Sequence, residues 1–116
     1  MMNIEAKIEF DVSKLKAKSE ADILRRQKIL DSLVLRDSNL FCPQDTGTLQ
    51  RSAEIHTVIG SGEVVWQTPY AAYQYYNWKG GKDSKNRNPR ATSKWFETAK
   101  ARYLDKWLEA IGAEHS

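Results

Sequence analysis

The chain has 116 residues, enough for one hydrophobic core, and we expect a single domain over residues 1–116. It is 41% hydrophobic, but no apolar run approaches the about 20 residues that span a bilayer, so a membrane-spanning protein is not expected. The net charge is +3 and is unevenly distributed. Residues 1–76 carry −1 (nine Lys/Arg, ten Asp/Glu) and residues 77–116 carry +4 (nine Lys/Arg, five Asp/Glu). A dedicated DNA-binding domain usually has a larger positive charge than this.

The first third of the chain predicts a strand followed by a long helix. Apolar and charged residues alternate over residues 4–10, as is typical of a half-buried strand. A helix is expected from Ser13 or Ser19 to about Leu40, because apolar residues recur at helical spacing, and Pro43 ends it. The opposite face of this helix is expected to be a solvated stripe of Arg25, Lys28, Asp31 and Arg36.

Residues 43–51 predict a tight turn that leads into a short helical turn. Asp45 is expected to cap that turn, its carboxylate accepting backbone N–H bonds. Gly47 supplies the backbone freedom that the turn requires. Leu49 is expected to anchor the turn to the core, with Arg51 pointing outward.

The next segment predicts a β-hairpin. Its strands are residues 54–59, with His56 in mid-strand, and residues 63–67, joined by the glycine-rich loop 60–62. Within the second strand, Val64 and Trp66 are expected to share one face, opposite Val65.

The chain leaves the hairpin through a proline and a tyrosine-rich segment. Pro69 closes the strand because proline lacks the N–H that a ladder requires. Tyr70 and Tyr73 are three residues apart, which favours a helical turn that buries their rings against the sheet.

Residues 77–91 predict a mobile basic loop, since they lack periodicity and contain two glycines and a proline. One interpretation is a solvated loop whose charge keeps the protein soluble. The alternative is a loop that contacts DNA or an acidic protein surface. The basic residues of the loop are Lys79, Lys82, Lys85, Arg87 and Arg90.

A final helix is predicted from a cap at Thr92 to about Ile111, with Gly112 stopping it. The whole pattern predicts an α+β fold: a small antiparallel β-sheet with a long N-terminal helix and a C-terminal helix packed on one face. The heaviest apolar residues, expected to dominate the core, are Trp66, Trp95, Phe96, Tyr103 and Trp107.

No residue pattern in the chain predicts catalysis, a metal site or a cofactor site. Cys42 has no histidine near it in sequence, and one cysteine cannot form an internal disulfide, which fits synthesis in a reducing cytoplasm. The triplet 45–47 (Asp-Thr-Gly) also occurs in aspartic proteases, but that chemistry needs two carboxylates and an apolar run before the aspartate. The loop 60–62 lacks the lysine pattern of a phosphate-binding loop.

The order of these segments resembles the minor capsid proteins of tailed bacteriophages, a family related to head–tail joining, tail-completion and neck proteins. The resemblance covers residues 23–111, and its motifs are short, so their order and spacing carry it. The matching residues are Pro43, Asp45, Thr46, Gly47, Leu49, Arg51 and Ser52 in the turn; Gly60, Gly62, Val64, Trp66, Pro69, Tyr70, Ala71 and Tyr73 in the hairpin and its exit; and Trp95, Phe96, Glu97 and Ala99 in the last helix.

The resemblance implies a non-enzymatic virion protein, made in the host cytoplasm, that forms a homo-oligomeric ring in the neck and joins the DNA-filled head to the tail. The implied partners are a portal-side connector or stopper protein, tail proteins and, transiently, DNA in the lumen, but no membrane. A tail-terminator role fits the same resemblance. We expect loop 77–91 to supply an assembly contact or to line the lumen. Two other classes stay open: a nucleic-acid-binding module that uses this loop with Tyr75, Tyr76 and Trp78, and an enzyme whose site the sequence does not reveal.

Overall fold

The computed structural model describes residues 3–7, 19–44, 46–79 and 86–112. These residues form a two-stranded antiparallel sheet and four helices, which confirms the predicted α+β class. None of the helices in these ranges is both long enough and apolar enough to cross a membrane. In chain order the elements are β1 (Asn3–Lys7), α1 (Glu20–Asn39), α2 (Thr48–His56), β2 (Glu63–Gln67), α3 (Ala71–Asn77) and α4 (Trp95–Ala110).

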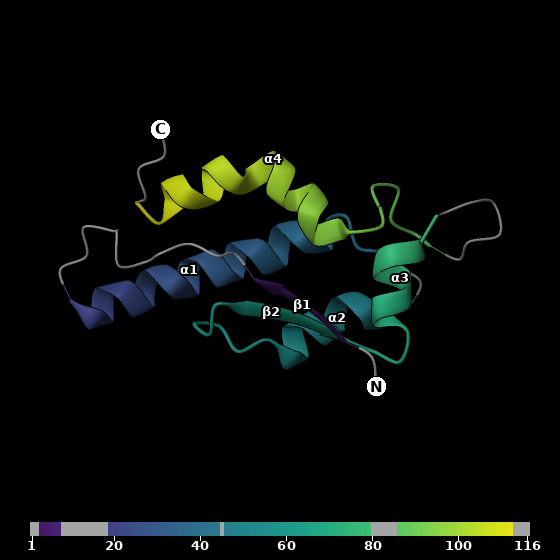
Figure 1. Cartoon of the computed structure of the whole chain (residues 1–116), viewed down its shortest axis with the longest axis horizontal. Helices are drawn as coiled ribbons and strands as arrows, with labels where there is room; N and C mark the ends of the chain where they lie inside the picture. Colours follow the sequence, from purple (N-terminus) through teal and green to yellow (C-terminus); the bar gives the residue numbers. More distant parts are fainter. Residues whose placement is uncertain (1–2, 8–18, 45, 80–85, 113–116) are drawn as a thin grey trace.

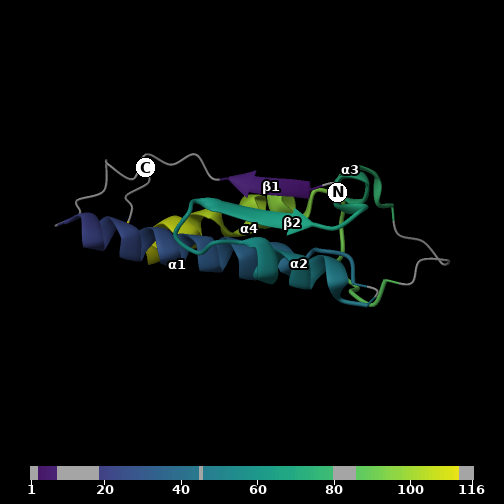
Figure 2. The ribbon, with the colours of Figure 1, turned by 90° about the horizontal axis from the view of Figure 1, so that it is seen from below.

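The helices α1 and α4 lie side by side and run in opposite directions, and the sheet lies over one side of this pair (Figures 1 and 2). The hydroxyl of Ser19 accepts a hydrogen bond from the backbone N–H of Asp22 at 3.1 Å, so the later of the two predicted starts of α1 is the one observed. The buried apolar residues of both helices follow the predicted helical spacing. They include Leu30 and Val34 from α1 and Phe96, Ala99 and Trp107 from α4, and Ile111 at the C-cap of α4 continues the stripe.

The two strands of the sheet are far apart in sequence and pair antiparallel, with Asn3 opposite Gln67 and Lys7 opposite Glu63. The predicted hairpin is therefore wrong: β2 pairs with β1, and most of residues 54–59 belong to the end of α2 and the turn after it. The predicted strand at residues 4–10 is confirmed over 4–7, whereas 8–10 lie outside the described residues.

The other edge of β2 explains why no hairpin is needed. The backbone N–H of Val65 donates to the hydroxyl of Thr57 at 3.0 Å, and that of Gln67 donates to the hydroxyl of Ser52 at 3.1 Å. Two side chains around the end of α2 thus satisfy donors that a neighbouring strand would otherwise bind. His56, predicted to lie in mid-strand, is exposed at the end of α2.

Three of the five residues predicted to dominate the core, all tryptophans, form its centre; Phe96 is buried as well, whereas Tyr103 is only partly buried. Trp66 and Trp95 are fully buried, with their rings edge to face at 5.9 Å between centroids, and Trp107 is 1% exposed. The indole N–H of Trp66 donates to Oδ1 of Asn39 at 2.9 Å, and that of Trp107 donates to Oδ2 of Asp37 at 2.7 Å. The polar end of α1 therefore supplies the acceptors that allow these large rings to be buried.

The start of α4 differs from the prediction, and its end does not. The N-cap position is Lys94, which adopts a left-handed φ of 48°, while the hydroxyl of Thr92 lies 3.1 Å from that of Thr98 instead of capping the helix. Gly112 ends the helix as predicted: its φ is 75°, and its N–H donates to the carbonyl of Glu109 at 3.0 Å.

Candidate functional site

The predicted turn at residues 43–51 leads into a nine-residue helix, α2, rather than a single helical turn. Its N-cap is Gly47, with a φ of 84° that favours glycine, and Asp45 lies outside the described residues. Leu49 is buried and Arg51 is exposed, which confirms both predictions. The guanidinium of Arg51 also reaches back and donates to the carbonyl of Thr46 at 3.2 Å, so this side chain holds the turn closed.

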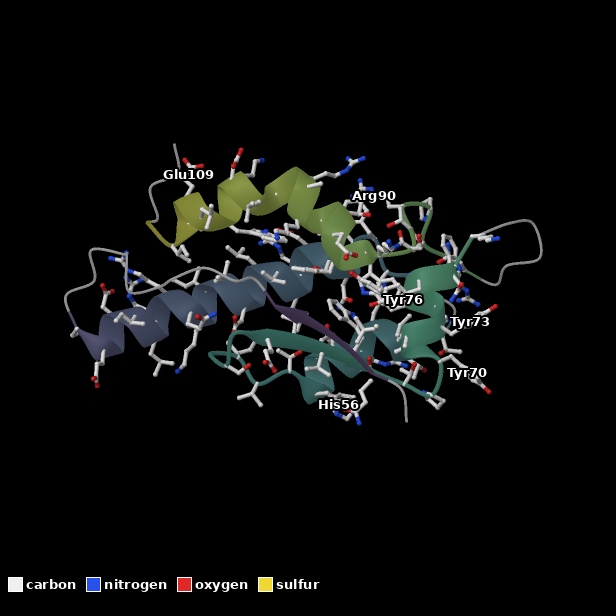
Figure 3. The ribbon with its side chains drawn as sticks, in the orientation of Figure 1. His56, Tyr70, Tyr73, Tyr76, Arg90 and Glu109 are labelled. Atoms are coloured by element: carbon white, nitrogen blue, oxygen red, sulfur yellow. The ribbon has the colours of Figure 1, made fainter. Side chains whose placement is uncertain are left out.

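The tyrosines after Pro69 are exposed, which corrects the prediction that Tyr70 and Tyr73 are buried. Tyr70, Tyr73 and Tyr76 are 69%, 63% and 60% exposed and lie at one end of the molecule (Figure 3). We call these three side chains the tyrosine face. They are exposed because the buried side of α3 consists of Ala71 and Tyr75, four residues apart.

Tyr75 is the tyrosine that fixes α3 to the rest of the protein. Its ring packs edge-on against Trp95 at 4.7 Å between centroids, and its hydroxyl donates to the carboxylate of Glu97. Burial raises the pKa of the Tyr75 hydroxyl, and the hydrogen bond to Glu97 raises it further. This contact joins α3 to the first turn of α4, so the tyrosine face has a rigid base.

The turn before α2 and the segment before α3, which are far apart in sequence, meet at a pocket. The pocket has a volume of 220 Å³ and is open at the surface. We call it the motif pocket, because most of its lining comes from the two segments that carried the family resemblance. Val64 and Trp66, also part of that resemblance, are buried in the core instead. The pocket is lined by Thr46, Thr48, Leu49, Thr68, Pro69, Tyr70 and Gln74.

The second half of the predicted mobile loop has fixed hydrogen-bond partners that the sequence reasoning missed. The side chain of Asn88 donates to the carbonyls of Leu40 and Cys42, both at 2.8 Å. The side-chain oxygen of Asn86 accepts from the backbone N–H of Gln44 at 2.7 Å. The sequence Asn-x-Asn-Pro was the available signal, since asparagine side chains commonly bind nearby backbone in turns.

Of the five basic loop residues, the structure describes three. Lys79, Arg87 and Arg90 are exposed, and Arg90 lies near the start of α4 rather than among the tyrosines (Figure 3). Lys82 and Lys85 lie outside the described residues.

A second group of exposed apolar residues lies at the other end of α2. Ile55, Val58 and Ile59 are 74%, 71% and 39% exposed, and Leu24 of α1, 47% exposed, lies beside Gly60. We call the three residues Ile55, Val58 and Ile59 the loop patch. Single exposed apolar residues are common, whereas three so close together in the chain make this turn a candidate interaction surface.

A buried aspartate holds the turn that follows the loop patch. Oδ2 of Asp31 accepts from the backbone N–H groups of Gly60 at 2.7 Å and Gly62 at 2.9 Å, and Oδ1 accepts from the amide of Gln27 at 2.8 Å. Asp31 is 3% exposed, which corrects its predicted place in a solvated stripe. The N–H groups of the glycine loop 60–62 thus point at a carboxylate of the same protein, not at a phosphate group.

The candidate chemical groups of the described residues do not gather into a reactive centre. Cys42 is fully buried, and burial raises the pKa of its thiol, which opposes the thiolate that a nucleophile needs. No group of three or more His, Cys, Asp or Glu side chains within the described ranges is placed to hold a metal ion. What the structure presents instead is two apolar surfaces on rigid supports.

A family model described as minor capsid protein matches residues 6–113. The chain belongs to the minor capsid protein family. Neither a curated protein nor a solved structure matches it. The match confirms the resemblance seen in the sequence and makes this minor capsid protein a structural component of a phage virion. Such a role favours a protein that acts by binding rather than by catalysis.

Proposed function

We propose that this minor capsid protein is a head–tail joining component of the phage neck, which works as a closed ring of identical copies between the DNA-filled head and the tail. The observation that carries the proposal is the presence of two different exposed apolar surfaces: the tyrosine face on α3, whose Tyr70 lines a pocket with the first turn of α2, and the loop patch in and after the last turn of α2. A symmetric pair of subunits uses one surface twice, whereas a ring uses two different surfaces that meet head to tail.

The residue types of the two surfaces also support self-assembly. Tyrosines are enriched in protein interfaces because they combine a large apolar ring with a polar tip and have few rotatable bonds. The loop patch offers branched aliphatic side chains of the kind that fill the space between such rings. The two faces of the resulting ring would then be free for a portal-side connector or stopper protein and for tail proteins.

The proposal is tested by blocking production of the protein during phage infection and imaging the products by negative-stain electron microscopy. We expect DNA-filled heads and separate tails, with infectious particles restored when purified protein is added to the extract. Joined, infectious particles in the absence of the protein would refute the joining role. Tails of abnormal length would instead indicate the tail-terminator role.

A contact with DNA is a second candidate, favoured by the exposed guanidinium groups of Arg87 and Arg90. The backbone around them is held by the Asn86 and Asn88 hydrogen bonds, so the two charges have a defined position from which to meet phosphates. Retention of the purified protein on a DNA column should then fall steeply with salt, and Arg87→Ser with Arg90→Ser should flatten that dependence. Retention that does not respond to salt would remove this candidate.

A further inference from the structure

We infer that the motif pocket and the adjoining tyrosine face receive the loop patch of a second copy of this chain, which assigns a role to the residues of the family motifs. This inference rests on the proposed ring and specifies which two surfaces of each subunit meet. It also identifies the motif segments as the walls of a self-binding site rather than as parts of a catalytic one.

The receiving surface is continuous. Tyr70 belongs to both the motif pocket and the tyrosine face, and it is 69% exposed. Leu49 and Pro69 add apolar wall to the pocket, while Thr46 and Thr48, whose hydroxyls lie 2.7 Å apart, form its polar rim. An apolar pocket with a polar rim is the arrangement found at the centre of stable protein interfaces.

The inserting surface projects from the protein and is already ordered. Val58 and Ile59 stand in the turn after α2, and Asp31 fixes the glycines directly behind them. The backbone N–H of Ser61 donates to the carbonyl of Val58 at 3.0 Å, which closes the turn itself. A turn that is fixed before binding loses little conformational entropy on binding, so its apolar side chains contribute more fully to affinity.

Charge complementarity selects a second copy as the occupant. Arg51 lies beside the motif pocket and Lys79 directly after α3, and both are exposed. Glu54 and Glu63 flank the loop patch, where Lys28 beside Gly60 is the opposing charge. Among the described residues, the receiving end therefore carries these two basic side chains against the carboxylate of Glu97, which bonds Tyr75 on α3, and the inserting end carries two acidic side chains against Lys28, so unlike ends attract.

The position of the two surfaces makes the contact intermolecular. The loop patch lies in and after the last turn of α2, which ends at His56, whereas the motif pocket is lined by Thr48 and Leu49 of its first turn together with Tyr70, so one helix separates the two surfaces; Figure 3 labels His56 and Tyr70. Each copy must therefore bind the next copy and be bound by the previous one. Repetition of that step closes a ring or continues as a filament, according to the angle between neighbours.

The test is chemical cross-linking in particles that have been assembled with cysteine variants. Tyr70→Cys and Val58→Cys are combined in one chain, and joined particles are treated with a short bis-maleimide reagent. We expect a ladder of covalent oligomers on a denaturing gel. Wild-type particles treated with the same reagent control for the native Cys42, which is fully buried and should not react.

Single variants and a mismatched pair make the outcome specific. Tyr70→Cys alone and Val58→Cys alone should give no dimers, because each surface meets its opposite and not itself. Tyr70→Cys combined with Ala101→Cys, an exposed position on α4, should also give none. Dimers from either single variant, or the absence of a ladder from the Tyr70 and Val58 pair, would overturn the inference.

Charge insertion gives an independent readout that does not depend on cross-linking. Tyr70→Asp and Val58→Asp should each reduce the yield of joined particles by more than about tenfold, because a buried unpaired charge disrupts an interface centre. Ala101→Asp is the matched control and should leave the yield unchanged. Normal joining with both variants would overturn the pairing of these surfaces while leaving the joining role itself standing, since that role is judged only by particles that lack the protein.

Discussion

Replacing Asp31 by alanine should destabilise the protein and loosen the turn behind the loop patch. The carboxylate is 3% exposed, and its three donors are two backbone N–H groups and one side-chain amide. The substitution removes every one of these acceptor contacts at once. Because Gly60 and Gly62 have φ values of 104° and 86°, the turn has few other low-energy conformations in which its N–H groups find partners.

The magnitude follows from the number and type of bonds lost. A hydrogen bond to a charged group contributes about 1.5–3 kcal/mol, but both glycines are partly exposed, so water will replace part of the loss. We therefore expect Asp31→Ala to lower the free energy of unfolding by about 3 kcal/mol. At roughly 4 °C per kcal/mol for a domain of this size, the melting temperature should fall by about 12 °C.

Urea and thermal unfolding followed by tryptophan fluorescence provide the assay, since Trp66 and Trp95 are fully buried in the folded protein. Asp31→Asn is the matched control, because its amide oxygen still accepts both glycine N–H groups, whereas the charge and the acceptor for the Gln27 amide are lost, so we expect a smaller loss of about 1–2 kcal/mol. A loss below about 0.5 kcal/mol for Asp31→Ala, the range of ordinary surface substitutions, would refute the argument.

Three further outcomes are expected. Asp37→Ala should cost about 1–3 kcal/mol in urea titrations, because the buried indole N–H of Trp107 loses its acceptor, and Asp37→Asn should cost less; equal losses would contradict this assignment. The Cys42 thiol, buried and with a raised pKa, should react with a thiol-reactive dye only when urea unfolds the protein, and rapid labelling of the folded protein at pH 8 would contradict its burial. Since the hydroxyl of Tyr75 has a raised pKa when folded, the unfolded chain releases this proton first as the pH rises above about 10, and stability falls there. Tyr75→Phe should therefore flatten the dependence of unfolding free energy on pH in that range, and an unchanged slope would contradict the raised pKa that burial and the Glu97 hydrogen bond give this hydroxyl.

The sequence predicted what depends on regular periodicity. The stripe from Phe96 to Ile111 repeats at helical spacing over four turns, so the side of α4 that is buried could be read directly. The face that Val64 and Trp66 share follows in the same way from the alternation of a strand. In each case several residues of one element repeat the same pattern, so the prediction of the buried face does not depend on any single residue.

The sequence misled where a few polar side chains decide the structure. Residues 54–59 have the composition of a strand, but Ser52 and Thr57 supply hydroxyls that bind the edge of β2, and α2 continues to His56. Asp31 lies at a position of α1 that the helical pattern assigns to the solvated face, and its burial is explained by its hydrogen bonds to Gly60 and Gly62, which are distant in sequence. Contacts such as these join residues 8 to 31 positions apart, and no local pattern records them.

The placement of these polar contacts argues for assembly through preformed surfaces. The sequence predicted that loop 77–91 is mobile, yet Asn88 ties its second half to the carbonyls of Leu40 and Cys42. Asp31 does the same for the turn behind the loop patch, and Arg51 for the turn at the motif pocket. Each of these side chains fixes a loop beside an exposed surface, where a binding partner gains most from a rigid target. If assembly used these surfaces only after refolding them, Asp31→Ala and wild type would join heads to tails equally well at every temperature at which both remain folded. A preformed surface instead requires the variant to lose joining activity first as the temperature rises, before the fold itself unfolds.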